Sequence, residues 1–191
     1  MYRYNHNADT TMAKLISADI SNNKLCILEY TTTDGQMLSL KEDEFDAKIV
    51  SHTYTDVGKI IFDKPIARIG EWTFYKCSSL TSVVIPDSVT AIGEWAFSDC
   101  SNLTSITIPD SVTTIGSSAF AWCKSLTSLT IGKSVSEIGK KAFEGCNIDT
   151  IVCYPQIPPK LNDSFDGFEN LIVPTGCEEA YANSDWGKYL E

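Results

Sequence analysis

The chain has little histidine, no excess of basic residues and no long apolar run, and each shortage excludes a class of function. Its two histidines, His6 and His52, are too few for most Ser-His-Asp, Cys-His or poly-histidine metal designs. Against 25 Asp+Glu stand only 15 Lys+Arg, so the formal net charge is −10. Nucleic acid and anionic membrane surfaces both require clustered basic residues. No stretch approaches the ~18 apolar residues of a membrane span. We therefore expect no nucleic acid partner and no membrane insertion.

The N-terminus also lacks the apolar run of roughly 7–15 residues that a signal peptide needs. We expect an extracellular or cell-surface protein if a leader was removed before Met1, and otherwise a cytoplasmic one. The 191 residues suit one domain with a small appendage, and 43% hydrophobic residues are enough to build a core.

A strict repeat lies within this ordinary composition. Aligning the chain on Ile-Gly gives a spacing of 23 residues, at Gly70, Gly93, Gly116 and Gly139. The same register holds phenylalanines at 74, 97, 120 and 143 and cysteines at 77, 100, 123 and 146. Residues 77–99 and 100–122 share 15 identities in 23. Such self-similarity is the signature of a stacked solenoid.

Each unit predicts one coil of that solenoid. Leu80, Val83 and Ile85 alternate with outward positions, which is typical of a short strand, and Pro86 ends it. Ser-Val-x-x-Ile-Gly is expected to turn the chain, with Gly93 supplying a permissive backbone. The Ala-Phe-x-x-Cys segment is expected to return as a helical turn or 3₁₀ segment. Stacked coils then form a parallel sheet with columns of identical side chains.

The repeat I-P-x-S-V-x-x-I-G-x-x-A-F-x-x-C-x-x-L resembles the BspA-like leucine-rich repeat, also called the Treponema pallidum type, over about residues 58–175. The segments 47–51, 59–63, 171–174 and 179–181 resemble the entry and end segments of such proteins in gut Bacteroidetes. The resemblance implies a surface or secreted interaction protein, often an adhesin for host matrix proteins.

The expected fold is an α/β repeat solenoid: a short right-handed leucine-rich repeat with a parallel β-sheet, short helical or 3₁₀ returns and an N-terminal β-hairpin cap. Residues 1–21 are expected to be a mobile segment, 22–57 the hairpin and cap, 58–154 the solenoid, and 155–191 a final strand and cap. The hairpin would join residues 24–33 to 36–40 through Asp34-Gly35. Six solenoid strands are expected, with Phe165 and Phe168 replacing the Phe column and Tyr181, Trp186 and Tyr189 closing the far end.

The seven cysteines suggest packing rather than chemistry. A 23-residue period places sulfurs along a line, whereas a metal site needs ligands that converge. In-register Cβ vectors also run parallel, which disfavours disulfides between neighbouring coils. We interpret the column, and Cys153, as buried thiols acting as small hydrophobic groups. Cys26 and Cys177 are the candidates for exposed thiols.

The acidic residues and His52 also favour structural roles. The run Glu42, Asp43, Glu44 and Asp46 is typical of a solvated turn or helix start. Asp87, Asp110 and Lys133 share one column after the strand, where a turn role suffices. His52 is interpreted as a structural or solvated loop histidine. We predict no catalytic residues, no metal ligands and no cofactor, so the chain is expected not to be an enzyme.

Two surfaces remain as candidate binding sites. One is the outward face of the predicted sheet, represented by Ser82, Val84, Ser105, Thr107, Ser128 and Thr130. The other is an aromatic group formed by Trp72, Trp95, Trp122 and Tyr75. Each surface also has an interpretation without binding: the first is a solvated β face, and the second is a stripe of tryptophans that pack on one another. Tryptophan is, however, enriched at binding hot spots.

Three functions follow, in decreasing order of support. The first is a non-enzymatic protein-interaction module, adhesin-like and at the surface or secreted, whose partner is a host matrix protein or another surface protein. The second is a structural or self-associating spacer, with the oligomeric state left open. The third, remote possibility is a hydrolase that uses the acidic columns.

Overall fold

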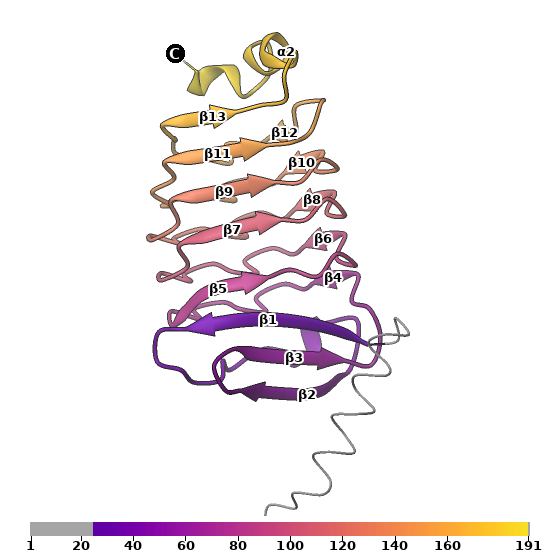
Figure 1. The fold of residues 1–191 in the computed structure, drawn as a ribbon. Coiled ribbons are helices and arrows are strands. Elements are labelled where there is room, and N and C mark those ends of the chain that lie inside the picture. The colour runs from indigo at the N-terminus through magenta and orange to yellow at the C-terminus, as the bar shows by residue number, and fades with distance from the viewer. Residues whose placement is uncertain (1–24, 191) are drawn as a thin grey trace, which may run out of the picture.

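The computed structural model describes residues 25–190, and the predicted N-terminal segment 1–21 lies outside them. Consecutive coils stack along one axis, as Figure 1 shows from the indigo cap to the yellow C-terminus. The outward strands form a parallel sheet, which confirms the predicted solenoid. In spatial order they are β13 (Asn170–Ile172), β11 (Thr150–Cys153), β9 (Ser128–Ile131) and β7 (Ser105–Ile108). Below β7 lies β5 (Leu80–Val84), where the Thr104 N–H donates to the Thr81 carbonyl at 3.4 Å.

A second parallel sheet lies along the Ile-Gly column, where only a turn was predicted. Its two-residue strands are β12 (Lys160–Leu161), β10 (Glu137–Ile138), β8 (Thr114–Ile115), β6 (Ala91–Ile92) and β4 (Arg68–Ile69). A glycine follows each of β4, β6, β8 and β10. It is required because a Cβ at that position would clash with neighbouring atoms, and not because the backbone conformation excludes other residues. A Cβ on Gly116 would lie 2.7 Å from the backbone of Gly93 in the preceding coil. The coils therefore approach each other too closely along this column to admit a side chain.

The third side of each coil is built from turns, so the prediction of helical or 3₁₀ returns was wrong. Alternate N–H groups point along the stack: those of Trp72, Phe74 and Lys76 donate to carbonyls of the next coil at 2.7–3.1 Å. The N–H groups between them close turns within their own coil. This alternation requires residues in the left-handed backbone conformation. Trp72 and Lys76 adopt it, each with φ of 60°. A helical segment would keep these hydrogen bonds inside one coil and leave the next coil unpaired.

The core is organised in columns, as the repeat predicts. Phe74, Phe97, Phe120, Phe143 and Phe165 stack in parallel with ring centroids 4.8–5.2 Å apart and planes within 4°. All but Phe165 are at most 1% exposed, so the coil spacing sets the ring spacing. Phe165, rather than Phe168, continues the column, and Phe168 meets it edge-on at 5.7 Å.

The cysteine column does more than fill space. Three of its four thiols donate to a phenylalanine carbonyl of the preceding coil, as Cys100 does to Phe74 and Cys123 to Phe97, each at 3.2 Å, whereas Cys77 donates to the Ser39 carbonyl at 3.9 Å. The Phe74 and Phe97 carbonyls also accept a backbone N–H, so the thiol adds a second hydrogen bond that a plain hydrophobic group does not make. All seven cysteines are free.

Burial makes most of these thiols poor nucleophiles, because it disfavours the thiolate. It raises the pKa of Cys77 to about 11 and that of Cys153 to about 12. The pKa of Cys123 lies well above its ordinary value because of the neighbouring Cys100 thiol and burial. Cys26 is only 8% exposed, so its prediction as an exposed thiol was wrong, whereas Cys177 is half-buried.

The N-terminal cap differs from the predicted hairpin. Strand β1 (Cys26–Thr32) runs antiparallel between β3 (Gly58–Phe62) and β5, and β2 (Ile49–Tyr54) pairs with the other edge of β3. Residues 36–40 form no strand, because both edges of β1 are already occupied. The acidic run forms the 3₁₀ helix η1 (Glu42–Glu44). A β-hairpin is present in the cap, but it is formed by β2 and β3.

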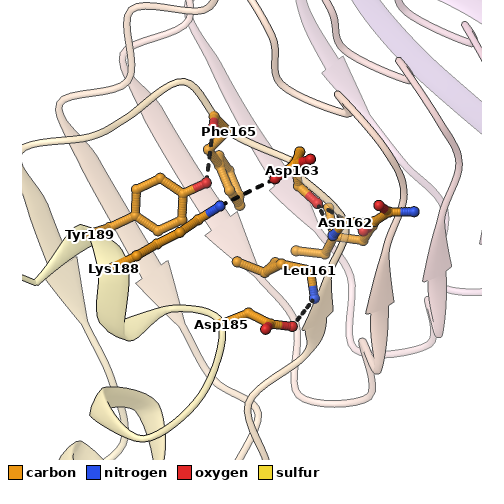
Figure 2. Close-up of polar contacts among 9 residues, drawn as sticks. Leu161, Asn162, Asp163, Phe165, Asp185, Lys188 and Tyr189 are labelled. Atoms are coloured by element: carbon orange, nitrogen blue, oxygen red, sulfur yellow. Dashed lines mark hydrogen bonds and ion pairs between the residues drawn. The ribbon is translucent and has the colours of Figure 1, made fainter.

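The C-terminal cap consists of α2 (Glu178–Ala182) and the 3₁₀ helix η2 (Gly187–Tyr189). Tyr181 and Trp186 are fully buried, and the Trp186 indole N–H donates to the Pro159 carbonyl at 2.8 Å. Figure 2 shows that the Tyr189 hydroxyl donates to the Phe165 carbonyl, while Asp185 accepts from the Leu161 N–H. These aromatic side chains and hydrogen bonds cover the last coil.

Candidate protein-binding surfaces

The six predicted sheet-face residues lie together on the outward side of β5, β7 and β9. Ser105 stands opposite Ser128, and Thr107 opposite Thr130, in register. Val84 is 62% exposed, while the alternating residue Val83 is 7% exposed, as the period of a strand predicts. On the neighbouring β11 and β13 the threonine column continues as Val152 and Ile172, so the face becomes more apolar toward the C-terminus.

Two adjoining depressions lie over this face and beside it, at the turn after β9. One, of about 480 Å³, is lined by residues such as Val84, Thr107 and Thr130. The other, of about 540 Å³, lies between Lys133 and the segment 154–158. Tyr154 lines both depressions and is 55% exposed. Together they form a groove, the sheet-face groove, with no charged side chain on the strand positions that form its floor.

Two groove residues were not among the predicted site residues. Tyr154 and Ile157, the latter 83% exposed, follow β11 in the segment where prolines interrupt the repeat. The signal that marks them is that interruption: a stretch released from the repeat is free to carry large apolar side chains. Sequence reasoning noted the break but treated it only as the start of the cap.

Charge is confined to the rim of the groove. Lys133 forms an ion pair with Asp110 at 2.6 Å and donates its backbone N–H to the same carboxylate at 3.0 Å. These contacts hold the pKa of Asp110 below its ordinary value, opposite to the raised pKa of a general acid. Within residues 25–190, no group of three or more His, Cys, Asp or Glu is placed to hold a metal ion.

The four predicted aromatic residues lie on the third side of the coils, apart from the groove. Trp72 and Trp95 stack at 5.1 Å with planes 7° apart, and Tyr75 meets Trp72 edge-on at 4.7 Å. Trp122 belongs to a different column, that of Lys76 and Asp99, and is 46% exposed. The structure therefore divides the predicted site residues between two separate surfaces.

His52 lies on strand β2 rather than in a loop. Its Nε2 is 2.6 Å from the hydroxyl of Tyr30, which also accepts the Leu38 N–H at 3.3 Å. Partial burial lowers the pKa of His52, and the nearby charge of Glu42 opposes that shift. Through Tyr30, His52 thus links strand β2 to β1 and to the segment that follows β1, which is a structural role.

Comparison with known families decides what these coils are. A model of the BspA type leucine rich repeat region matches residues 49–172 in six copies, from β2 to β13. The chain belongs to the BspA type leucine-rich repeat family. For this BspA-type protein the family suggests a protein-interaction module. Within residues 25–190, no helix is long and apolar enough to span a membrane.

Two solved structures resemble this BspA-type protein. A leucine-rich repeat protein from Bacteroides ovatus is 38% identical, with a TM-score of 0.46, over 55% of this chain and 28% of that chain. The T. pallidum leucine-rich repeat protein is 18% identical, with a TM-score of 0.42, over 64% of this chain and 80% of that one. The chain thus spans just over a quarter of the Bacteroides ovatus protein. No curated protein matches it.

Proposed function

We propose that this chain is a non-enzymatic protein-binding module that holds its partner in the sheet-face groove. The observation that carries the proposal is the groove itself: an open, uncharged floor of small side chains, bounded by exposed aliphatic and aromatic groups at Val84, Tyr154 and Ile157. Exposed apolar side chains that line a hollow typically mark interaction sites. Small hydroxyl side chains allow a partner's backbone to approach closely while supplying hydrogen bonds.

The shape favours an extended partner over a small substrate. The two depressions follow one another across several coils and are open to solvent, whereas small-molecule sites enclose most of the ligand surface. Affinity would then come from many modest contacts with the apolar groups as anchors. We extend the proposal to location and partner: a surface or secreted adhesin-like protein whose partner is a host matrix protein or another surface protein. That extension is supported by the family alone.

A charge placed on the groove floor tests the binding site. Thr107→Arg adds a long cation at an exposed position, so the fold is expected to be retained while a docked partner meets an unpaired charge. Thr113→Arg is the matched control, because Thr113 is also exposed but precedes β8 on another side of the coil. Binding to immobilised collagen, laminin and fibronectin is measured for the wild type and both variants by surface plasmon resonance.

The expected result is that at least one of these proteins binds, and that Thr107→Arg weakens it by about tenfold while Thr113→Arg does not. Equal binding by the two variants would exclude the groove, and no binding to any of the three would exclude the matrix partner. Sedimentation velocity of the wild type then distinguishes the spacer: a mass that rises with concentration favours self-association. Antibody labelling of intact cells tests the surface location.

A further inference from the structure

The aromatic side of the coils contains a separate slot. A depression of about 280 Å³ is lined by Tyr75, Trp95, Ser98, Asp99, Trp122 and Lys124. It lies on the third side, formed by the turns, whereas the sheet-face groove lies over the outward strands. Its lining combines three aromatic rings with one carboxylate and one ammonium group. We call it the tryptophan slot.

The stacking of the coils explains why the slot is open. Trp72 covers one face of the Trp95 indole, so only the opposite face or an edge is left for the slot. In the next coil the same column holds Ser118, which is too small to cover that face. Trp122 lies against the next coil, where a Cβ on Gly145 would be 2.5 Å from its ring. The slot is bordered by the Trp95 and Trp122 side chains, with Ser98 and Asp99 also in its lining.

The backbone does not require tryptophan at these positions. Trp95 and Trp122 have φ of 57° and 64°, a left-handed conformation that is strained for an ordinary side chain. Their columns hold Ser118 and Gly145 elsewhere with the same sign of φ. Smaller residues therefore satisfy the fold equally well, and the large aromatic rings at 95 and 122 are surplus to it.

The charges identify what the slot would take. Within residues 25–190, the Asp99 carboxylate has no hydrogen bond or ion pair with another side chain. Glu94 accepts the Trp95 indole N–H at 2.9 Å, which holds a second carboxylate at the rim. Aromatic faces beside a carboxylate attract cations, and a planar guanidinium stacks on an indole while it pairs with a carboxylate through two N–H groups. Lys124 is the one opposing charge in the lining.

We propose that the tryptophan slot binds an arginine side chain of a partner protein, stacked against the Trp95 and Trp122 indoles and paired with Asp99. The guanidinium fits the slot better than a lysine ammonium, because it is planar and more weakly hydrated. The net charge of −10 of the whole chain also favours association with a basic partner. Whether the sheet-face groove binds anything does not affect this site, since the two surfaces share no lining residue.

Peptide titrations of the full chain, followed by NMR, test the proposal. The probes are acetyl-Gly-Arg-Gly-amide and the same peptide with citrulline, which keeps the shape of arginine without its charge. The readouts are the indole N–H signals of Trp95 and Trp122, assigned with Trp95→Phe and Trp122→Phe. The buried indole of Trp186 is an internal reference. We expect the arginine peptide to shift the two slot signals at concentrations about fivefold lower than the citrulline peptide.

Two charge variants should move the affinity in opposite directions. Asp99→Asn is expected to weaken arginine binding about threefold, and Lys124→Gln to strengthen it about twofold by removing repulsion. Asp87→Asn, an exposed carboxylate outside the slot, is the control and should leave it unchanged. Equal affinities for the arginine and citrulline peptides, unmoved slot signals, or equal effects of Asp99→Asn and Asp87→Asn would each overturn the proposal.

Discussion

The repeated coils and the N-terminal cap reach stability by different routes. In the coils every strand pairs with the strand 23 residues away or close to it, and the same side chain recurs at each level. In the cap, β1 is inserted between β3 and β5, so its partners lie 28–55 residues away and no side chain repeats. The coils are therefore held by identical local interfaces, whereas the cap depends on one specific arrangement of three distant segments.

The largest effect is expected in the phenylalanine column. Phe97→Ala removes a ring that stacks on both neighbours, at 4.8 and 5.0 Å, and should lower the free energy of unfolding by about 4 kcal/mol. The cap residue Phe45, which meets Phe62 tilted and Phe74 edge-on, is the counterpart, and Phe45→Ala should cost about 3 kcal/mol. Urea unfolding followed by circular dichroism measures both. A larger loss for Phe45→Ala would mean that the cap, rather than the coil, limits stability.

Gly116 in the coils and Gly35 in the cap have different roles, and substitution by asparagine distinguishes them. Gly116 is needed because its neighbour's backbone is too close for a Cβ, so Gly116→Asn should cost about 3 kcal/mol of unfolding free energy or more. Gly35, in the turn after β1, has φ of 65° and free space around it. Because asparagine tolerates that conformation, Gly35→Asn should change stability by less than about 1 kcal/mol. Equal losses of stability for the two variants in thermal unfolding would show that steric crowding at Gly116 does not limit which residue the coil accepts there.

The smallest effect is a pH dependence confined to the cap. Burial lowers the pKa of folded His52 below its unfolded value of about 6.5, so the unfolded chain binds more protons near that pH. The contribution of neutral His52 to the free energy of unfolding is therefore fully present above about pH 6.5. It is lost as the pH falls through the pKa of the folded state. A protonated imidazole can only donate, so the Tyr30 hydroxyl can then no longer donate to Nε2.

The difference between wild type and His52→Gln, measured by urea unfolding between pH 7.5 and 5, isolates this contribution. The wild type should lose more stability on acidification than the variant does. Parallel pH curves for the two proteins would show that His52 does not couple the cap to protonation. Phe97→Ala, a coil substitution, should leave the pH dependence unchanged.

Much of the coil followed from the 23-residue period, because stacking turns each repeated residue into a column. Phe97, Cys123 and Val83 were placed in the core from spacing alone, and the structure buries all three. The returns were mispredicted because their hydrogen bonds run between coils, and local patterns do not report them. The hairpin was mispredicted for a similar reason: Asp34-Gly35 marked a turn correctly, but residues 36–40 had no free strand edge to join.

The candidate surfaces were predicted in part. Alternation along the strands identified Thr107 and Thr130 as outward, but Tyr154 and Ile157 lie outside the repeat and carry no periodic signal. The tryptophans were found from their variation within a column. Their separation from the groove, and the slot between Trp95 and Trp122, depend on how neighbouring coils overlap.

The sequence by itself determined that this protein is a stack of coils with phenylalanine, cysteine and isoleucine columns, because a strict period allows the apolar positions to be buried only against copies of themselves. The tertiary structure decided where the stack begins and which surfaces stay open. Strand β1 joins β3 and β5 because those edges are free in three dimensions, and the tryptophan slot exists because Trp95 and Trp122, which belong to different columns, come together from neighbouring coils. Both outcomes depend on which backbone edges and ring faces remain uncovered after the coils have stacked.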